Sequence, residues 1–276
     1  MKNQLTEEHK KKLCEIIVSG EKIHENVLAY LRKHNLPRSS SKGPFIKNLI
    51  HSLIDEFKLN ETHYIPNYPN TAELNQTEFD VIVGGLLGDS WIGYLKGSKN
   101  PSGSFTHKLE HLDYVKYKYE FLKRRCSPVA IHNKYDKRSD RHYQQAFCKL
   151  QSSPVLIPIQ QAFYKDGVKV VPKDLVMKLS PLGIAIWFMD DGASMAYGYK
   201  ISVDCFNDED IKVIRELFKK FDIDMEYYEC KWKIIKFTGK NAKKFKELVE
   251  PYICDCMKYK LQIYKQVKGK YVRSDI

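Results

Sequence analysis

Two short apolar segments of this chain each end on an aspartate, and this doubled pattern limits the fold more than any other feature. Residues 79–90 read FDVIVGGLLGDS, and residues 181–192 read PLGIAIWFMDDG. Each segment is too short to span a membrane and too apolar to lie on a surface, so each is predicted to be a buried helix. The chain therefore places two helices in a core and ends them on Asp89 and Asp191, 102 positions apart.

Residues that favour a helix start precede both segments. Asn75 followed by Glu78 has the spacing of a capping box, in which two side chains satisfy backbone amides at the helix end. Ser180 can cap the second helix, and Pro181 suits its first turn, where no amide donor is needed. These signals predict where each of the two helices begins.

The elements predicted after the two helices follow the same order, which indicates an internal duplication. After the first helix they are 104–109, 112–125, 129–135, 142–149 and a helical stretch to about 164. After the second they are 200–206, 208–221, 225–230, 233–238 and 241–252. The sequence therefore predicts an α/β (α+β) fold, an αββαββα unit that is duplicated about a pseudo-twofold axis.

The residues before the duplication are predicted to form a separate helical extension. Helices are expected at 7–33 and 44–58, and 59–74 has the composition of a linker. The predicted domains are an extension at 1–75, a first half at 76–172 and a second half at 173–276.

Three glycines in the first helix indicate that it packs closely against the second. Gly84, Gly85 and Gly88 each cost about 1 kcal/mol relative to alanine inside a helix, and close helix–helix approach is one reason to keep them. Such packing would bring Asp89 and Asp191 together at the junction of the halves, where their charges repel each other. A divalent cation relieves that repulsion, and hard oxygen ligands suit Mg²⁺. The alternative, that each aspartate only ends a helix, explains one Asp-Gly better than two in register.

The net charge of +12 indicates a polyanionic partner, although solubility alone is the alternative reading. Residues 76–276 contain 35 Lys/Arg and 25 Asp/Glu, whereas residues 1–75 are nearly balanced. The longest apolar runs have about seven residues, too few for a membrane span. We therefore expect a nucleic-acid surface in residues 76–276 and no membrane partner.

The cysteines and the N-terminus bear on the cellular setting. Seven cysteines without CxxC spacing favour reduced thiols, as in a cytoplasm or an organellar matrix, and the charged, acid-containing N-terminus is unlike a signal peptide. Cys254 and Cys256 are too close for an ordinary zinc pair. His107 and His111 lack the flanking pattern of a zinc helix, so we expect no zinc site.

The two apolar segments also resemble the signature motifs of a known family. IAIWFMDDG at 184–192 and IVGGLLGDS at 82–90 are similar to the paired motifs of single-chain LAGLIDADG homing endonucleases, and the resemblance extends over about residues 76–265. It implies that the final acid of each motif, Asp89 and Asp191, binds the metal, with Gly88 and Asp190 as further positions at the metal site. Ser90 stands where the family has its final glycine, so the first motif is the weaker match.

The resemblance also assigns two lysines to the site. YKDGVKVVP, which contains Lys169, resembles the segment that precedes the family's second motif, and MKYKL, which contains Lys260, resembles its terminal segment. In the family such lysines lie beside the metals and help to activate water or to neutralise developing charge. We therefore expect Lys169 and Lys260 to be catalytic together with Asp89 and Asp191.

By the same resemblance, the strands of each half form a saddle along the DNA major groove, where strand faces can contact base edges. A shift of one residue in strand register would exchange the two faces. The candidate DNA-contacting residues are Lys134, Lys137, Arg138, Arg141, Tyr143, Gln145, Ser202, Asp204, Lys231 and Lys233.

Together these features predict a Mg²⁺-dependent, site-specific endonuclease for double-stranded DNA, active in intron or intein homing. We expect a monomer with an internal pseudo-dimer and two or more metal ions, with Mn²⁺ able to substitute and Ca²⁺ supporting binding without efficient cleavage. One alternative is a maturase that binds intron RNA on the same fold and cuts little or not at all. Another is a DNA-binding regulator without catalysis.

Overall fold

The computed structural model describes residues 5–37, 44–66, 68, 70–137, 140–267 and 270–274, with side chains as far as Ile263. Within these ranges no helix has the length and apolar character needed to cross a membrane.

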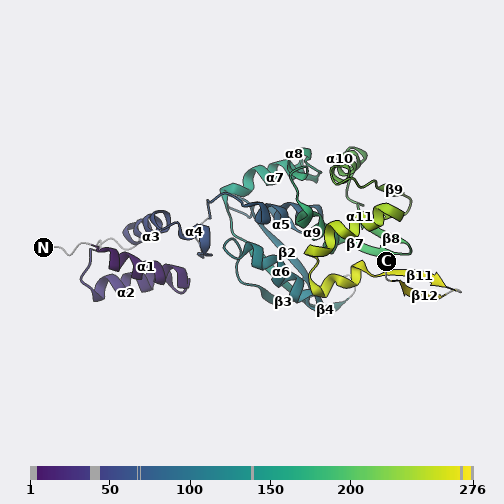
Figure 1. Cartoon of the computed structure of the whole chain (residues 1–276). Coiled ribbons are helices and arrows are strands. Elements are labelled where there is room, and N and C mark those ends of the chain that lie inside the picture. The colour runs from purple at the N-terminus through teal and green to yellow at the C-terminus, as the bar shows by residue number, and fades with distance from the viewer. Residues whose placement is uncertain are drawn as a thin grey trace.

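The N-terminal extension is a small helical unit with its own core (Figure 1). Its helices are α1 (Glu7–Ser19), α2 (Ile23–Lys33), α3 (Pro44–Glu56) and α4 (Leu59–Thr62). The single helix expected at 7–33 is wrong, because Gly20 takes the left-handed conformation with φ 72° and ends α1. Leu13, Ile17, Val27 and Leu31 are fully buried between these helices, so the extension is held together by its own apolar contacts.

The two halves contain the same elements in the same order. The first consists of α5 (Gln76–Leu87), β1 (Trp91–Gly93), β2 (Ser102–Lys108), α6 (Leu112–Leu122), β3 (Ala130–Asp136), β4 (Arg141–Leu150) and α7 (Ile157–Phe163). The second consists of α9 (Pro181–Asp191), β7 (Gly192–Met195), β8 (Gly198–Ser202), α10 (Asp208–Lys219), β9 (Glu226–Glu229), β10 (Lys233–Thr238) and α11 (Gly239–Val249). The predicted αββαββα duplication is confirmed, with β1 and β7 as the short strands that had no clear sequence signal.

Short elements connect and follow the halves. Between them lie the two-stranded ribbon of β5 (Tyr164–Lys165) and β6 (Val168–Lys169) and the short helix α8 (Lys173–Val176). After α11 come two 3₁₀ segments, η3 (Glu250–Tyr252) and η4 (Asp255–Leu261), and the hairpin of β11 (Ile263–Val267) and β12 (Lys270–Ser274).

Each half folds its strands into a four-stranded antiparallel sheet. The strand order is β1-β2-β4-β3 in the first half and β7-β8-β10-β9 in the second. Helices α5 and α9 lie side by side at the centre of the molecule, with one sheet to either side (Figure 1). A single hydrophobic core runs through both halves.

The glycines of α5 permit the close helix contact that the sequence predicted. A Cβ atom placed on Gly84 would lie 2.2 Å from the carbonyl oxygen of Gly183 on α9, so no larger residue fits without moving the helices apart. At the other end, Asp80 of α5 accepts hydrogen bonds from the backbone and the hydroxyl of Ser180, at 2.9 and 2.5 Å. These two contacts hold α5 and α9 together over the turns that precede the aspartates.

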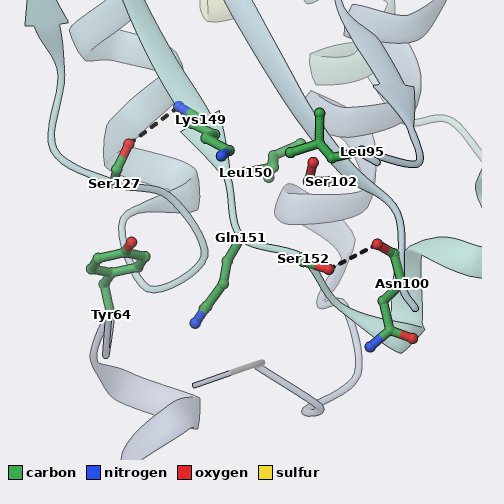
Figure 2. A pocket seen from close by; sticks show the side chains of 9 residues that line it. All are labelled: Tyr64, Leu95, Asn100, Ser102, Ser127, Lys149, Leu150, Gln151 and Ser152. Atoms are coloured by element: carbon green, nitrogen blue, oxygen red, sulfur yellow. Dashed lines mark hydrogen bonds between the residues drawn. The ribbon is translucent and has the colours of Figure 1, made fainter. Parts of the chain in front are cut away.

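The segment expected to be a linker is packed against the first half. Ile65, Tyr68 and Asn70 are buried, and the Asn70 amide donates to the carbonyl of Arg124. The amide of Gln151, just after β4, donates to the carbonyls of Ile65 and Tyr68. A pocket of about 310 Å³ lies at this junction, and Figure 2 shows Gln151 among the residues that line it. The extension is therefore anchored to the first half by hydrogen bonds to its connecting chain.

Candidate functional site

The C-terminal ends of α5 and α9 meet at one place and bring three aspartates together. A Cβ atom on Gly88 would lie 2.5 Å from Cβ of Asp190, so glycine is required at this contact. The backbone amide of Asp89 donates to Oδ2 of Asp190 at 3.3 Å. Asp191 follows at the end of α9. The last turns of two helices thus place carboxylates where both helix dipoles are negative.

Asp190 is turned into the protein and is neutralised there by the first half. Its Oδ1 accepts from Lys118 Nζ at 2.7 Å and from the Tyr114 hydroxyl at 2.8 Å. Both the Lys118 and Asp190 side chains are 0% exposed. Lys118 also lies 4.5 Å from the centre of the Tyr114 ring. Asp190 is therefore a fully paired buried carboxylate, which is a different environment from that of a free metal ligand.

Among the described residues, no lysine or arginine donates a hydrogen bond to the carboxylate of Asp89 or Asp191. Burial and the charge of Asp190 raise the pKa of Asp89, whose side chain is still 49% exposed. Burial, followed by the charges of Asp89 and Asp190, raises the pKa of Asp191 to about 7. In the part of the chain that the structure describes, the Asp191 carboxylate accepts no hydrogen bond and makes no ion pair. Two accessible, mutually repelling carboxylates fit a divalent cation, which would supply the missing positive charge.

Both lysines predicted from the family resemblance lie at this centre. Lys169 Nζ donates to the carbonyl of Gly88 at 3.0 Å, and Lys260 Nζ donates to the carbonyls of Met189 and Asp190 at 2.5 and 3.0 Å. Each lysine therefore caps the C-terminal end of one central helix. Burial lowers the pKa of both amines. Gly88, predicted at the metal site, presents its carbonyl to Lys169.

His107 completes the cluster and was not among the predicted site residues. Its Nε2 lies 3.2 Å from Lys118 Nζ, and its Nδ1 lies 3.8 Å from Asp89 Oδ2. One ligand-type atom from each of Asp89, His107 and Asp190 lies within 4.8 Å of the others, a group that does not include Asp191. Burial and the charge of Lys118 lower the pKa of His107 to about 3, so its ring is neutral at neutral pH.

A signal for Lys118 was present in the sequence. Tyr114, Lys118 and Leu122 follow one another at i, i+4 spacing, and all three are buried on one face of α6. At the 96-residue offset of the duplication, Lys118 corresponds to Ile214, which is fully buried in α10. A lysine where the repeat has an isoleucine predicts a buried cation in need of an anion, and that anion is Asp190.

Four candidate DNA-contacting residues of the first half, Lys134, Arg141, Tyr143 and Gln145, lie together on one sheet face. In β4, Ala146, Cys148 and Leu150 are buried, so the alternate residues point away from the core. Arg141, Tyr143 and Gln145 share that parity, and Lys134 pairs directly with Tyr143. Lys137 lies in the turn after β3, and Arg138 lies outside the described residues.

In the second half the predicted face is partly wrong. Ser202 lies on the outer face of β8, opposite Ile234 of β10. Lys233 has the parity of the buried Ile235, and its amine donates to the carbonyl of Phe206 at 3.3 Å. Because Ile234 and Ile235 are both apolar, the sequence alternation fits either register. In the structure Lys200 and Lys236 point outward and pair with each other.

Two other predicted contacts of this half lie in loops. Asp204 follows β8 and accepts hydrogen bonds from the Lys233 backbone amide at 2.6 Å and from the Ser202 hydroxyl at 2.9 Å, which gives it a turn-forming role. Lys231 lies between β9 and β10 with its amine 5.6 Å from the centre of the exposed Trp232 ring. Lys231 thus remains accessible, whereas Asp204 is engaged within its own half.

Comparison with known proteins gives one family for this arrangement. The model of the LAGLIDADG DNA endonuclease family matches residues 79–245. The cytochrome b mRNA maturase bI2 of Saccharomyces cerevisiae is 29% identical over 226 residues, which cover 75% of this chain and 52% of the maturase. The chain thus spans about half the length of that relative. The DNA endonuclease I-ChuI of Chlamydomonas applanata is 26% identical over 208 residues, 68% of this chain and 95% of that protein.

A solved structure supports the fold. The homing endonuclease I-WcaI bound to its DNA recognition sequence superposes with a TM-score of 0.64 over 75% of this chain and 98% of that chain, at 22% sequence identity. At that identity the likeness concerns the architecture, and it agrees with the two sheets and paired central helices described above.

Proposed function

This chain belongs to the LAGLIDADG DNA endonuclease family, and on that premise we propose that it is a site-specific endonuclease that cuts both strands of a long, asymmetric DNA target. The reaction is hydrolysis of a phosphodiester bond in each strand, supported by Mg²⁺, with Mn²⁺ as a substitute. The biological role is homing of an intron or intein, and one chain acts as a monomer because it contains both halves.

The observation that carries this proposal is the pair of unneutralised carboxylates at the ends of α5 and α9. Asp190, the residue before Asp191, is paired with Lys118, so the protein does neutralise one carboxylate at the end of α9. Asp89 and Asp191 lack such a partner and have raised pKa values. Leaving two of three carboxylates uncompensated destabilises the metal-free protein, which is expected where a cation is to bind.

The aspartates and the lysines of this site would have different roles at the scissile phosphates. Asp89 and Asp191 would hold the cations, and a bound divalent ion supplies Lewis-acid stabilisation and an acidified water. Lys169 and Lys260 keep a positive charge beside each helix end, where it stabilises the charge that develops on the phosphate. The carbonyl contacts of both lysines fix their amines before substrate arrives, so little reorganisation is needed during the reaction.

The two sheets supply the DNA surface. Their outward side chains differ, because the β3–β4 ladder extends past Gln145 and Tyr143 to Arg141, whereas the shorter β9–β10 ladder ends at Lys233 and Glu229. Different side chains on two related faces would contact two different half-sites, which supports an asymmetric target. Lysines and arginines among them contact phosphates and make binding salt-dependent.

The test is cleavage of a plasmid that carries the uninterrupted insertion site of the gene. Wild-type protein with Mg²⁺ is expected to linearise this plasmid and to leave a plasmid with the interrupted site intact. With Ca²⁺ it is expected to shift the same DNA in a gel and to cut it poorly, because looser coordination positions water less well. Wild-type protein that binds neither plasmid preferentially and cuts neither would refute the proposal.

One observation favours a second candidate function. The S. cerevisiae relative at 29% identity is a cytochrome b mRNA maturase, and a basic two-sheet surface is also suited to structured RNA. In this alternative the protein binds the intron RNA that encodes it and promotes splicing. Splicing of that RNA by wild-type protein, without cleavage of the insertion-site plasmid, would favour the maturase function.

A further inference from the structure

The surroundings of Asp89 and Asp191 are not equivalent, although the two residues end equivalent helices. His107, on β2 of the first half, lies beside Asp89 and is only 7% exposed. The corresponding position at the 96-residue offset is Val203, which is buried and has no polar side-chain atom. Asp89 therefore has a neighbour able to hydrogen-bond with it, and the equivalent position beside Asp191 does not provide one.

The hydrogen bonds of Lys118 determine which nitrogen of His107 carries the proton. A charged lysine amine has donors and no acceptor, and this amine donates to Asp190 at 2.7 Å. Nε2 of His107, 3.2 Å from this amine, must therefore accept. In a neutral imidazole the other nitrogen then carries the hydrogen, so Nδ1–H lies 3.8 Å from Asp89 Oδ2, and this separation shortens to a hydrogen bond when a cation fixes the carboxylate.

We propose that His107 is a positioning residue, which orients the Asp89 carboxylate for metal binding through an Nδ1–H donor fixed by Lys118 and Asp190. The inference rests on the proposed function only in taking Asp89 as a metal ligand. Asp190 is buried and accepts hydrogen bonds from Lys118 and Tyr114. His107 lies between this group and the half-exposed Asp89, so the fixed positions of the group limit where His107 can place its donor. Metal sites commonly depend on such a hydrogen bond to a ligand, and its loss weakens metal binding.

The same contacts exclude the simplest alternative, in which His107 binds the ion itself. A ligating nitrogen needs a free lone pair, and the lone pair of Nε2 faces the Lys118 amine. Nδ1 carries the hydrogen in this arrangement. Asp190 is likewise engaged, because Oδ1 accepts from Lys118 and Tyr114 and Oδ2 accepts from the amide of Asp89. Asp89, His107 and Asp190 thus have the spacing of a metal site, but Asp190 already accepts three hydrogen bonds, whereas Asp89 is half exposed.

The first test reads the tautomer in the metal-free, full-length protein. Two-bond ¹H–¹⁵N spectra of protein labelled at histidine distinguish the two neutral tautomers, and the His107 signals are assigned by their absence from the His107→Asn variant. The expected result at pH 7 is a neutral ring protonated at Nδ1. A ring protonated at Nε2, or a doubly protonated ring, would overturn the proposal. This measurement does not depend on whether the protein cuts DNA.

The second test measures metal dependence by Mn²⁺ titration of the protein–DNA complex, followed both by electron paramagnetic resonance and by single-turnover cleavage. His107→Phe removes the donor and is expected to raise the Mn²⁺ concentration for half-saturation about 10–100-fold, without changing DNA affinity. His107→Asn is expected to recover most of the loss, because its amide nitrogen can donate from nearly the same place as Nδ1. His111→Phe, a change at a nearby histidine without a carboxylate contact, is the matched control.

Equal losses in His107→Phe and His107→Asn would show that the histidine only fills space, and the proposal would fail. An unchanged Mn²⁺ requirement in His107→Phe would have the same consequence. If wild-type protein binds Mn²⁺ but cuts no target, the proposed function fails, and the tautomer and the Mn²⁺ titrations still decide the role of His107.

Discussion

The two halves of this molecule differ most informatively at one pair of equivalent positions. The last turn of α5 has Gly88 where α9 has Asp190, and α10 has Ile214 where α6 has Lys118. The additional acid on the second central helix is thus balanced by an additional base from the first half, at 2.7 Å. The two differences belong together, because Asp190 and Lys118 form a buried ion pair, whereas the equivalent residues Gly88 and Ile214 are uncharged.

This exchange leaves the twofold part of the site unchanged. Asp89 and Asp191 end their helices, and Lys169 and Lys260 each bind a carbonyl at one of those ends. Under the proposed function, this duplicated site keeps its symmetry in the groups that would meet substrate and loses it in the groups that support them. The following predictions test this division, beginning with the largest effect.

Asp191→Asn and Asp89→Asn are each expected to lower single-turnover cleavage by about a thousandfold or more, because each removes a charge that holds a cation. The double variant is expected to be little worse than either single one, since the two carboxylates act as a unit. Cleavage rate and gel-shift affinity are measured together, and affinity is expected to remain close to that of wild type.

Cleavage at the wild-type rate by both variants would mean that the aspartates only end helices. Asp190→Asn gives a second comparison, because it removes a neighbouring carboxylate that supports the site through Lys118, and it is expected to lower cleavage by less than either Asp89→Asn or Asp191→Asn. If Asp190→Asn lowers the cleavage rate as much as Asp191→Asn does, the metal ligands and the supporting residues cannot be separated as proposed.

Lys118→Met is expected to destabilise the protein by about 3–5 kcal/mol, because it leaves Asp190 buried without a cation. The double change Lys118→Met with Asp190→Asn removes both charges and is expected to recover most of this loss. Ile214→Met, the equivalent position in the second half, is expected to cost less than about 1.5 kcal/mol. Urea unfolding of wild type, Lys118→Met, Asp190→Asn, the double variant and Ile214→Met measures these differences, and additive effects of the two changes at 118 and 190 would contradict a coupled pair.

Local signals predicted the helices well, whereas contacts between distant residues were not predictable. Asn75 and Ser180 identify the starts of α5 and α9 because a cap and its amide lie within a few residues of each other. The role of Lys118 depends on Asp190, 72 positions later, and no local pattern specifies that contact. Lys233 was assigned to the wrong face because Ile234 and Ile235 are both apolar, and alternation then fits either register.

The carboxylate pair is expected to respond to pH more strongly at Asp191 than at Asp89. With its pKa raised to about 7, Asp191 must lose a proton to hold a cation, so the Mn²⁺ requirement should rise about tenfold per pH unit below 7 and level off above it. Because the folded pKa lies above the unfolded one, protonated Asp191 stabilises the metal-free fold at low pH, and this contribution is lost as pH rises through about 7.

Thermal unfolding in the presence of EDTA, at pH 6 and pH 8, checks the sign. Asp191→Asn is expected to be more stable than wild type at pH 8 and nearer to wild type at pH 6. Asp89→Asn should show a smaller difference between the two pH values, because Asp89 is half exposed and lies beside His107. A larger pH dependence at Asp89 would reverse the comparison.

The smallest expected effects concern the two sheet faces, where single lysines contribute through phosphates. Lys134→Ala in the first sheet and Lys236→Ala in the second each remove an outward amine, so each should lower the slope of log affinity against log salt by about one unit. Lys233→Ala is the control, because this side chain lies on the inner parity and donates to the carbonyl of Phe206. Since the Lys233 amine already has a partner within the protein, it releases few counterions on binding, and the slope of Lys233→Ala should equal that of wild type.

Binding is measured in Ca²⁺ at three or more salt concentrations, so that cleavage does not interfere. If Lys233→Ala lowers the slope as much as Lys236→Ala, the DNA lies on the other face of β10 and the two sheets are not related as their strand orders imply. If only Lys134→Ala has an effect, the asymmetry between the halves extends from the support of the site to the DNA surface itself.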